Sequence, residues 1–140
     1  MNRDLVRQVW LRAEGCCEYC KLLARFHPSP FQVDHIIARQ HGGVSELSNL
    51  ALSCLHCNVR KGPNIAGVDP LSPDPVRLYH PRNDVWAEHF QWNGAELTGR
   101  TAVGRVTINV LGINAPDFLE VRSELMREGC LLYTSPSPRD

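Results

Sequence analysis

The sequence lacks a long apolar segment and has no net charge. No apolar run approaches the roughly 18 residues that cross a bilayer, and the first ten residues, MNRDLVRQVW, contain no signal-peptide core. We therefore expect neither a membrane-spanning nor a secreted protein, no membrane partner, and a cytoplasmic location. The formal net charge of zero provides no overall attraction to polyanions.

The composition is that of a small globular protein. A length of 140 residues suits one domain, and 43% hydrophobic residues is an ordinary fraction for a soluble globule. The charges are unevenly spread, because residues 1–62 hold eight Lys/Arg and five Asp/Glu, whereas the remainder holds seven and ten. The basic part of the chain is therefore its N-terminal half.

The six cysteines point to a metal site. Without a secretory signal, two C-x-x-C pairs are better explained by one tetrahedral zinc ion than by disulfides. Cys16 could replace its neighbour as a ligand, and His56, inside the second pair, could replace a cysteine. The residues of the two pairs are Cys17, Cys20, Cys54 and Cys57.

A short stretch of the chain concentrates further polar residues of chemical interest. From Val33 to Lys61 it contains, in order, Asp34 and His35, Gly42 and Gly43, Asn49, and Asn58 directly after the second cysteine pair. An imidazole can take a proton from water near neutral pH. Carboxylate and amide oxygens are the ligands that Mg²⁺ prefers. The stretch thus combines a base with oxygen donors for a hard cation.

This arrangement resembles the HNH endonuclease family, whose catalytic unit is a ββα-metal finger. The resemblance covers roughly residues 13–62. It implies an α+β fold: a small ββα-metal (His-Me) finger held by zinc, with an N-terminal helix and a C-terminal accessory lobe of β-hairpin and helix. It also implies metal-dependent hydrolysis of DNA phosphodiester bonds.

Each polar residue has an expected role in that chemistry. His35 is the general base, and Asp34 and Asn58 are ligands of a catalytic Mg²⁺ or Mn²⁺. Asn49 ties the loop to the strand and orients the imidazole. The four paired cysteines hold a separate, structural Zn²⁺. The residues expected to contact DNA are Arg39, His41, Arg60 and Lys61.

Two other functions are compatible with part of this pattern. A zinc-held nucleic-acid-binding module without catalysis would keep the finger but not the turnover. A purely structural zinc protein gives no reason for Asp34, His35 and Asn58 to occur together. A homodimer would account for double-strand cleavage, although no coiled-coil pattern supports one.

Periodicity and turn residues predict the elements. In the first part we expect a helix over Asp4–Glu14, a strand over Phe31–Ile37, a second strand from Asn49 and a helix over Leu55–Lys61. Beyond a proline-rich segment, 63–81, we expect two or three strands among Phe90–Leu97, Thr98–Thr101 and Arg105–Leu111, with a turn at Asn93-Gly94, and then a helix over Ala115–Arg127.

These elements suggest three parts. Residues 1–62 form the nuclease finger with its zinc knuckles, and residues 63–129 form an accessory segment that wraps it. Residues 130–140 continue no pattern, and we expect a disordered or non-native tail there.

Overall fold

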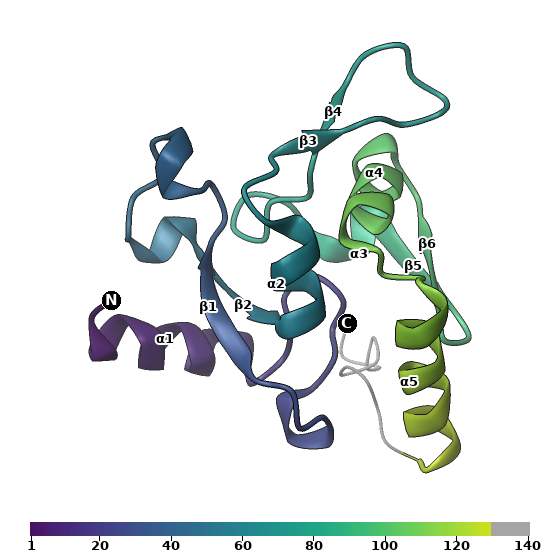
Figure 1. The fold of residues 1–140 in the computed structure, drawn as a ribbon, viewed down its shortest axis with the longest axis horizontal. Helices are drawn as coiled ribbons and strands as arrows, with labels where there is room; N and C mark the ends of the chain where they lie inside the picture. Colours follow the sequence, from purple (N-terminus) through teal and green to yellow (C-terminus); the bar gives the residue numbers. More distant parts are fainter. Residues whose placement is uncertain (130–140) are drawn as a thin grey trace.

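A computed structural model describes residues 1–129 (Figure 1); the predicted tail lies outside the described residues. In chain order the helices and strands are α1 (Arg3–Ala13), β1 (Phe31–His35), β2 (Leu50–Cys54), α2 (Leu55–Lys61), β3 (Ala66–Gly67), β4 (Val76–Arg77), α3 (Trp86–His89), β5 (Phe90–Asn93), β6 (Glu96–Gly99), α4 (Ala102–Leu111) and α5 (Pro116–Arg127). Single 3-10 turns occupy Ala24–Phe26, Arg39–His41 and Leu47–Asn49.

The centre of the molecule is the ββα unit predicted from the sequence. Strands β1 and β2 pair antiparallel, with Phe31 opposite Cys54 and His35 opposite Leu50. Helix α2 follows β2 without a loop, because the Cys54 side chain caps it by accepting a hydrogen bond from the amide of Cys57. The bounds of α2 agree with the prediction, and Gly62 caps its C-terminal end.

Helix α1 packs on the outer side of this unit. Asn2 caps the helix by accepting a hydrogen bond from the Asp4 amide at 2.7 Å, and the chain reverses at Glu14 and Gly15, both with positive φ. Val9 is fully buried and forms a small apolar cluster with Leu50 and Leu52 of β2. The expected helix is therefore present and braces the second strand.

The C-terminal part contains the expected hairpin and final helix, and it has two strands where two or three were expected. Strands β5 and β6 pair around Gly94, and α5 matches the predicted helix. The strand expected over Arg105–Leu111 is wrong, because these residues belong to α4. Thr101 caps α4 by accepting from the Gly104 amide at 3.1 Å.

Packing explains why α4 overrides the strand preference of its β-branched residues. Val106 and Leu111 are fully buried and Ile108 nearly so, so the apolar side of the helix faces the core. A Cβ on Gly104 would lie 2.1 Å from the carbonyl oxygen of His89. The helix therefore approaches the α3–β5 junction more closely than any other residue type would permit.

One large core joins both halves of the chain. Its buried members come from the first knuckle, from the β2–α2 junction, from the hairpin and from α4 and α5. The expected α+β fold is confirmed: an N-terminal helix, small two-stranded sheets, C-terminal helices and a cysteine cluster. Within residues 1–129 no helix has the length and apolar character that a membrane span requires.

Candidate metal centre and catalytic site

The two cysteine pairs meet in the core. All four side chains are buried and their sulfurs lie within 4.8 Å of one another. The sulfurs of Cys20 and Cys54 are 3.7 Å apart, far longer than the roughly 2.05 Å of a disulfide. Zn–S bonds of about 2.3 Å in a tetrahedron place sulfurs about 3.8 Å apart. The cluster therefore fits a structural zinc ion.

Hydrogen bonds among these thiols shift the pKa values of Cys17 and Cys20 in opposite directions. Burial opposes ionisation of Cys17, but hydrogen bonds from Cys20, Cys54 and Cys57 outweigh it and lower the Cys17 pKa well below its ordinary value. Burial and the hydrogen bond with Cys17 raise the pKa of Cys20. A lowered Cys17 pKa eases formation of the thiolate, which is the form that binds a metal ion.

Two short backbone structures aim the sulfurs at one point. In the first knuckle, the amide of Cys17 donates to the Leu22 carbonyl at 2.8 Å, and the amide of Lys21 donates to the Cys17 carbonyl at 2.9 Å. In the second, the turn is the start of α2 itself. The cage thus fastens the segment after α1 to the β2–α2 junction.

The two alternative ligands lie outside the cage. The Cys16 sulfur is 3.6 Å from the Cys17 carbonyl oxygen, and burial raises the pKa of this thiol to about 12. The ring of His56 stacks on Phe118 with centroids 3.9 Å apart, and its Nε2 lies 2.8 Å from the Gly112 carbonyl oxygen. Neither side chain belongs to the four-sulfur cluster.

Arg122 of α5 is a buried neighbour of the cage that was not predicted from the sequence. Its guanidinium is fully buried, donates to the Ala95 carbonyl at 2.8 Å, and lies over the rings of Trp92 and Phe118. Burial lowers its pKa, whereas the nearby thiols, Cys20 foremost, act to raise it. A cation here offsets the negative charge of a zinc–thiolate centre. Its only signal in the sequence was an arginine on the apolar side of an amphipathic helix.

Asp34 has an unsatisfied buried oxygen. Its Oδ2 atom accepts no hydrogen bond within the described residues, and the Lys61 ammonium is 3.8 Å away. Burial raises the pKa of Asp34, and the charge of Lys61 opposes that rise. An orphaned carboxylate oxygen is the kind of donor that a hard divalent cation would complete.

Asn58 lies on the Asp34 side of the finger. Gln32 and Asp34 are two residues apart on β1 and therefore share a face. The Asn58 Nδ2 group donates to Gln32 Oε1 at 2.8 Å, and Lys61, one turn later on α2, pairs with Asp34. The hydrogen bond uses the amide nitrogen of Asn58 and not the oxygen that a metal would require.

His35 points to the other face of β1, as strand alternation dictates. Its Nε2 atom is 2.8 Å from the hydroxyl oxygen of Ser45. Ser45 is exposed and belongs to the loop between β1 and β2. This partner could not be predicted from the sequence, because a single serine in a polar loop carries no distinguishing signal.

Asn49 ties the loop to the strand with three hydrogen bonds. Its Oδ1 accepts from the Ile37 amide at 2.9 Å, and its Nδ2 donates to the carbonyls of Ile37 at 3.0 Å and Val44 at 2.9 Å. Because Val44 precedes Ser45, Asn49 holds the residue that contacts His35. The structure therefore connects Asn49 to the imidazole through the loop and not by direct contact.

The glycine pair in this loop has two different reasons to be glycine. Gly42 has a φ of 91°, and a Cβ there would meet no atom within 4 Å. A Cβ on Gly43 would lie 1.7 Å from the Ile37 carbonyl oxygen and 2.9 Å from Asn49 Nδ2. Positive φ therefore matters at the first position and close backbone approach at the second.

This difference gives a test of the loop geometry. Gly42→Ala should cost about 1 kcal/mol of stability, from the left-handed backbone alone. Gly43→Ala should cost about 3 kcal/mol, because the backbone at Ile37 must move. Urea denaturation of the two variants measures this order; equal losses would show that the close approach at Gly43 does not constrain the loop.

The residues expected to contact DNA do not all lie on the surface. Arg39, His41 and Arg60 are exposed. Lys61 is 2% exposed, pairs with Asp34 and donates to the His35 carbonyl at 3.3 Å. The Lys61 ammonium therefore lies inside the finger and not on the surface that DNA would meet.

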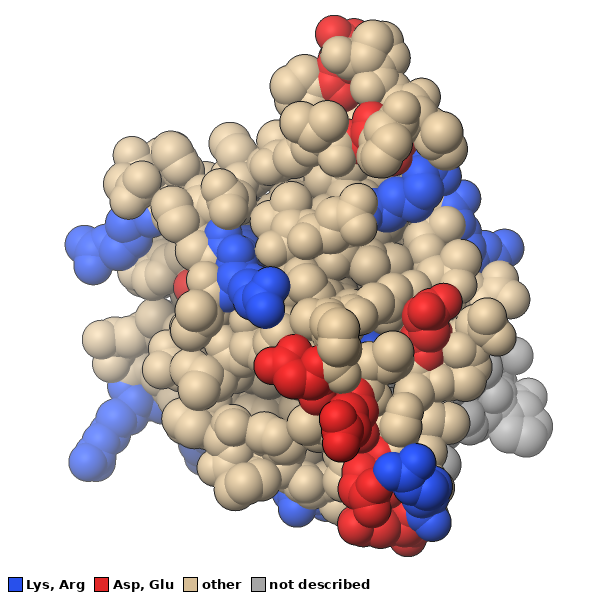
Figure 2. All heavy atoms as spheres, turned by 45° about the vertical axis from the view of Figure 1, so that its right-hand side comes forward, with Lys and Arg blue, Asp and Glu red and all other residues tan. Residues whose placement is uncertain are grey.

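Acidic side chains are concentrated along helix α5. Helix α5 carries exposed Asp117, Glu120 and Glu124, and Glu128 follows it, at spacings that place them along one side. Figure 2 shows acidic side chains gathered in a band on the lower part of this face. Such a band repels a phosphate backbone, so this side of α5 is unsuited to DNA.

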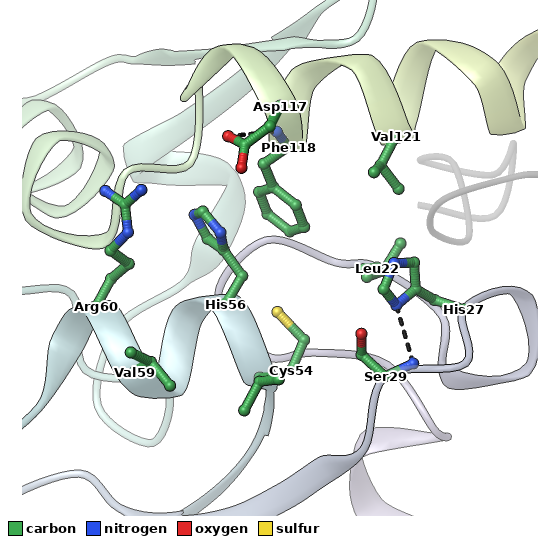
Figure 3. Close-up of a pocket in the computed structure, with 11 residues that line it drawn as sticks. Leu22, His27, Ser29, Cys54, His56, Val59, Arg60, Asp117, Phe118 and Val121 are labelled. Carbon is green, nitrogen blue, oxygen red and sulfur yellow. Dashed lines mark hydrogen bonds between the residues drawn. The ribbon is translucent and has the colours of Figure 1, made fainter.

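A pocket of about 400 Å³ lies between α2 and the start of α5 (Figure 3). Val59, Phe118 and Val121 give it an apolar lining, with Arg60 and His56 at one side. Asp34, His35 and Asn58 do not line it. Asp117 of the acidic band also lines this pocket.

The fold and site together define a ββα finger with a four-cysteine cage and an acid–histidine pair at the end of its first strand. Residues 17–64 match the family described as HNH endonuclease, which confirms the resemblance. The match indicates a nuclease or another nucleic-acid-related function. Searches of curated proteins and of solved structures gave no match for the chain.

Proposed function

We propose that the chain is a metal-dependent endonuclease that hydrolyses phosphodiester bonds of DNA. The observation that carries the proposal is the placement of side chains on the two faces of β1. His35 lies on one face, and Asp34 lies on the other face together with the Asn58 side of α2. A base and an oxygen-donor site thereby flank the end of one strand. Attack and charge stabilisation can then come from different sides of one phosphate.

The contact with Ser45 suggests which nitrogen of His35 is the base. If Nε2–H donates to the Ser45 hydroxyl, the lone pair is on Nδ1. Nδ1 then takes a proton from water as its oxygen bonds to phosphorus and the bond to the leaving oxygen breaks. The imidazolium returns that proton to solvent. Asn49 acts here as a positioning residue, because it holds the loop that presents Ser45.

Asp34 and Asn58 are the residues that would hold Mg²⁺ or Mn²⁺. When bound, such an ion would stabilise negative charge on the phosphate and on the leaving oxygen. Lys61 favours the ionised form of Asp34 against its burial, and the ionised carboxylate is the form that binds a cation. Lys61 thus supports the site from inside the finger. The zinc cage has only a structural role in this scheme.

A supercoiled-plasmid nicking assay tests the proposal against a non-catalytic binding module. The purified chain should nick the plasmid with Mg²⁺ or Mn²⁺ and not without added divalent metal. Asp34→Asn should reduce nicking with zinc content unchanged. Plasmid binding by gel shift without any nicking in either metal would favour the binding module.

The Ser45 contact makes a finer prediction. Ser45→Ala should lower the nicking rate about tenfold and shift its pH profile, because the imidazole loses the group that fixes its tautomer and orientation. Ser45→Thr keeps the hydroxyl and should restore most of the rate. An unchanged rate and pH profile in Ser45→Ala would remove Ser45 from the mechanism.

A further inference from the structure

A groove outside the catalytic centre joins the N-terminal part of the chain to the accessory lobe. It has a volume of about 770 Å³ and lies between the segment 12–23 and the segment 85–92. None of the residues predicted from the sequence to act in catalysis or DNA contact lines it. Its walls combine an aromatic surface with several cations.

The aromatic surface is a fixed indole. Trp86 donates its Nε1–H to the Tyr19 carbonyl at 2.9 Å, and its ring packs against Phe90 and Trp92 with centroids 5.1 and 5.9 Å away. The Lys21 ammonium lies 5.4 Å from the ring centroid. The indole is thus fixed in the wall of the groove, and an unpaired base can stack on it when the Lys21 side chain turns from the ring to a phosphate.

The charge of the groove is positive. Arg12, Lys21 and Arg100 line it, and Arg12 and Arg100 are exposed. Of its two acidic residues, Glu18 is already neutralised by an ion pair with Arg82 and accepts from the Leu52 amide. The exposed Glu14 is then the one acid in the groove without an ion pair among residues 1–129.

Arg12 links this groove to the proposed catalytic centre. Its guanidinium donates to the carbonyls of Leu47 at 3.0 Å and Leu50 at 2.7 Å. Leu50 is the residue opposite His35 in the β1–β2 ladder, and Leu47 begins the turn that ends at Asn49. An extended ligand that lies along the groove would therefore reach the loop that holds the His35 imidazole.

We propose that this groove binds single-stranded DNA next to the phosphodiester that is cleaved, with an unpaired base stacked on Trp86 and phosphates against Arg12, Lys21 and Arg100. The choice of DNA as ligand rests on the proposed function. Stacking on a protein ring requires a free base face, which a paired duplex does not offer away from its ends. The substrate is then a DNA with an unpaired segment beside the cut, such as a flap or fork.

Binding of a labelled oligo(dT) of about 10 nucleotides, followed by fluorescence anisotropy in buffer without added divalent metal, tests the groove. The full chain should bind it more tightly than a duplex of equal length or oligo(rU). Trp86→Leu should weaken binding at least about fivefold, the equivalent of ~1 kcal/mol of stacking. Tighter binding of the duplex or of the RNA would overturn the assignment.

Charge variants keep the test valid if Trp86→Leu folds poorly. Lys21→Gln and Arg100→Gln should each reduce the slope of log affinity against log salt concentration by about 0.7. Arg127→Gln, the same change on the acidic side of α5, is the matched control and should leave the slope unchanged. Wild-type affinity and slope in both groove variants would overturn the proposal.

The same samples separate this inference from the proposed function. His35→Ala should bind oligo(dT) as the wild type does, because His35 is outside the groove. Oligo(dT) binding that depends on Lys21 and Arg100 in a chain that never nicks DNA would refute the nuclease and retain the groove. Nicking that requires His35, with binding insensitive to the groove variants, would refute the groove and retain the nuclease.

Discussion

Replacing Cys54 and Cys57 with serine should unfold the protein and remove about one zinc ion per chain. Structural zinc contributes apparent free energies of about 10–16 kcal/mol in small zinc domains, as much as the whole stability of an ordinary domain, about 5–15 kcal/mol. The sulfurs also lie inside the main core, so their loss removes packing and metal together. Metal analysis and circular dichroism measure both effects.

Cys16→Ser is the matched control for that experiment. It makes the same chemical change one residue from the first knuckle, at a thiol outside the cage. It should retain the zinc and the fold. Equal zinc loss in Cys16→Ser and in the double variant, or a double variant that stays folded without metal, would contradict the cage.

His35→Ala should lower the rate of DNA nicking by about 10²–10⁴-fold, the usual contribution of a positioned general base. The side chain is on the face of β1 away from the main core and contacts an exposed serine, so stability and zinc content should change little. The loss therefore belongs to catalysis and not to folding. Single-turnover nicking of supercoiled plasmid with Mg²⁺ measures it.

His27→Ala is a suitable comparison for the imidazole variant. His27 lies in the loop before β1 and accepts a hydrogen bond from the Ser29 amide, away from the loop around Asn49. The nicking rate of His27→Ala should match that of the wild type. If His35→Ala retains the wild-type rate in Mg²⁺, another group is the base.

Motifs whose spacing alone fixes the geometry were predictable from the sequence. Two residues between Cys17 and Cys20, and between Cys54 and Cys57, allow each pair to reach one ion, and the structure brings all four sulfurs together. The α2 helix was bounded by the second pair and by Gly62. In both cases local chemistry determines the structure within a few residues.

The sequence did not predict features of the structure that depend on residues far apart in the chain. Arg105–Leu111 is rich in β-branched residues, but tertiary packing against the hairpin makes it helical. Lys61 has the sequence context of a surface cation at the end of a helix, and its burial depends on Asp34 across the finger. Ser45 gains its contact with His35 only when Asn49 folds the loop back.

The division of the chain into a finger and an accessory segment stays a prediction. A boundary near residue 62 suits the family match over residues 17–64, yet the main core contains Cys17 and Leu125 together. We therefore propose that the accessory segment completes the finger and does not fold apart from it. The groove at Trp86 lies at the same junction.

A crystal soaked in Mn²⁺ and measured at the manganese absorption edge tests the central claim most directly. We predict an anomalous peak within about 2.0–2.5 Å of an Asp34 oxygen and of the Asn58 Oδ1, on the opposite side of β1 from His35. Manganese bound elsewhere, with Asp34 still paired to Lys61 and Asn58 to Gln32, would contradict the proposed catalytic centre.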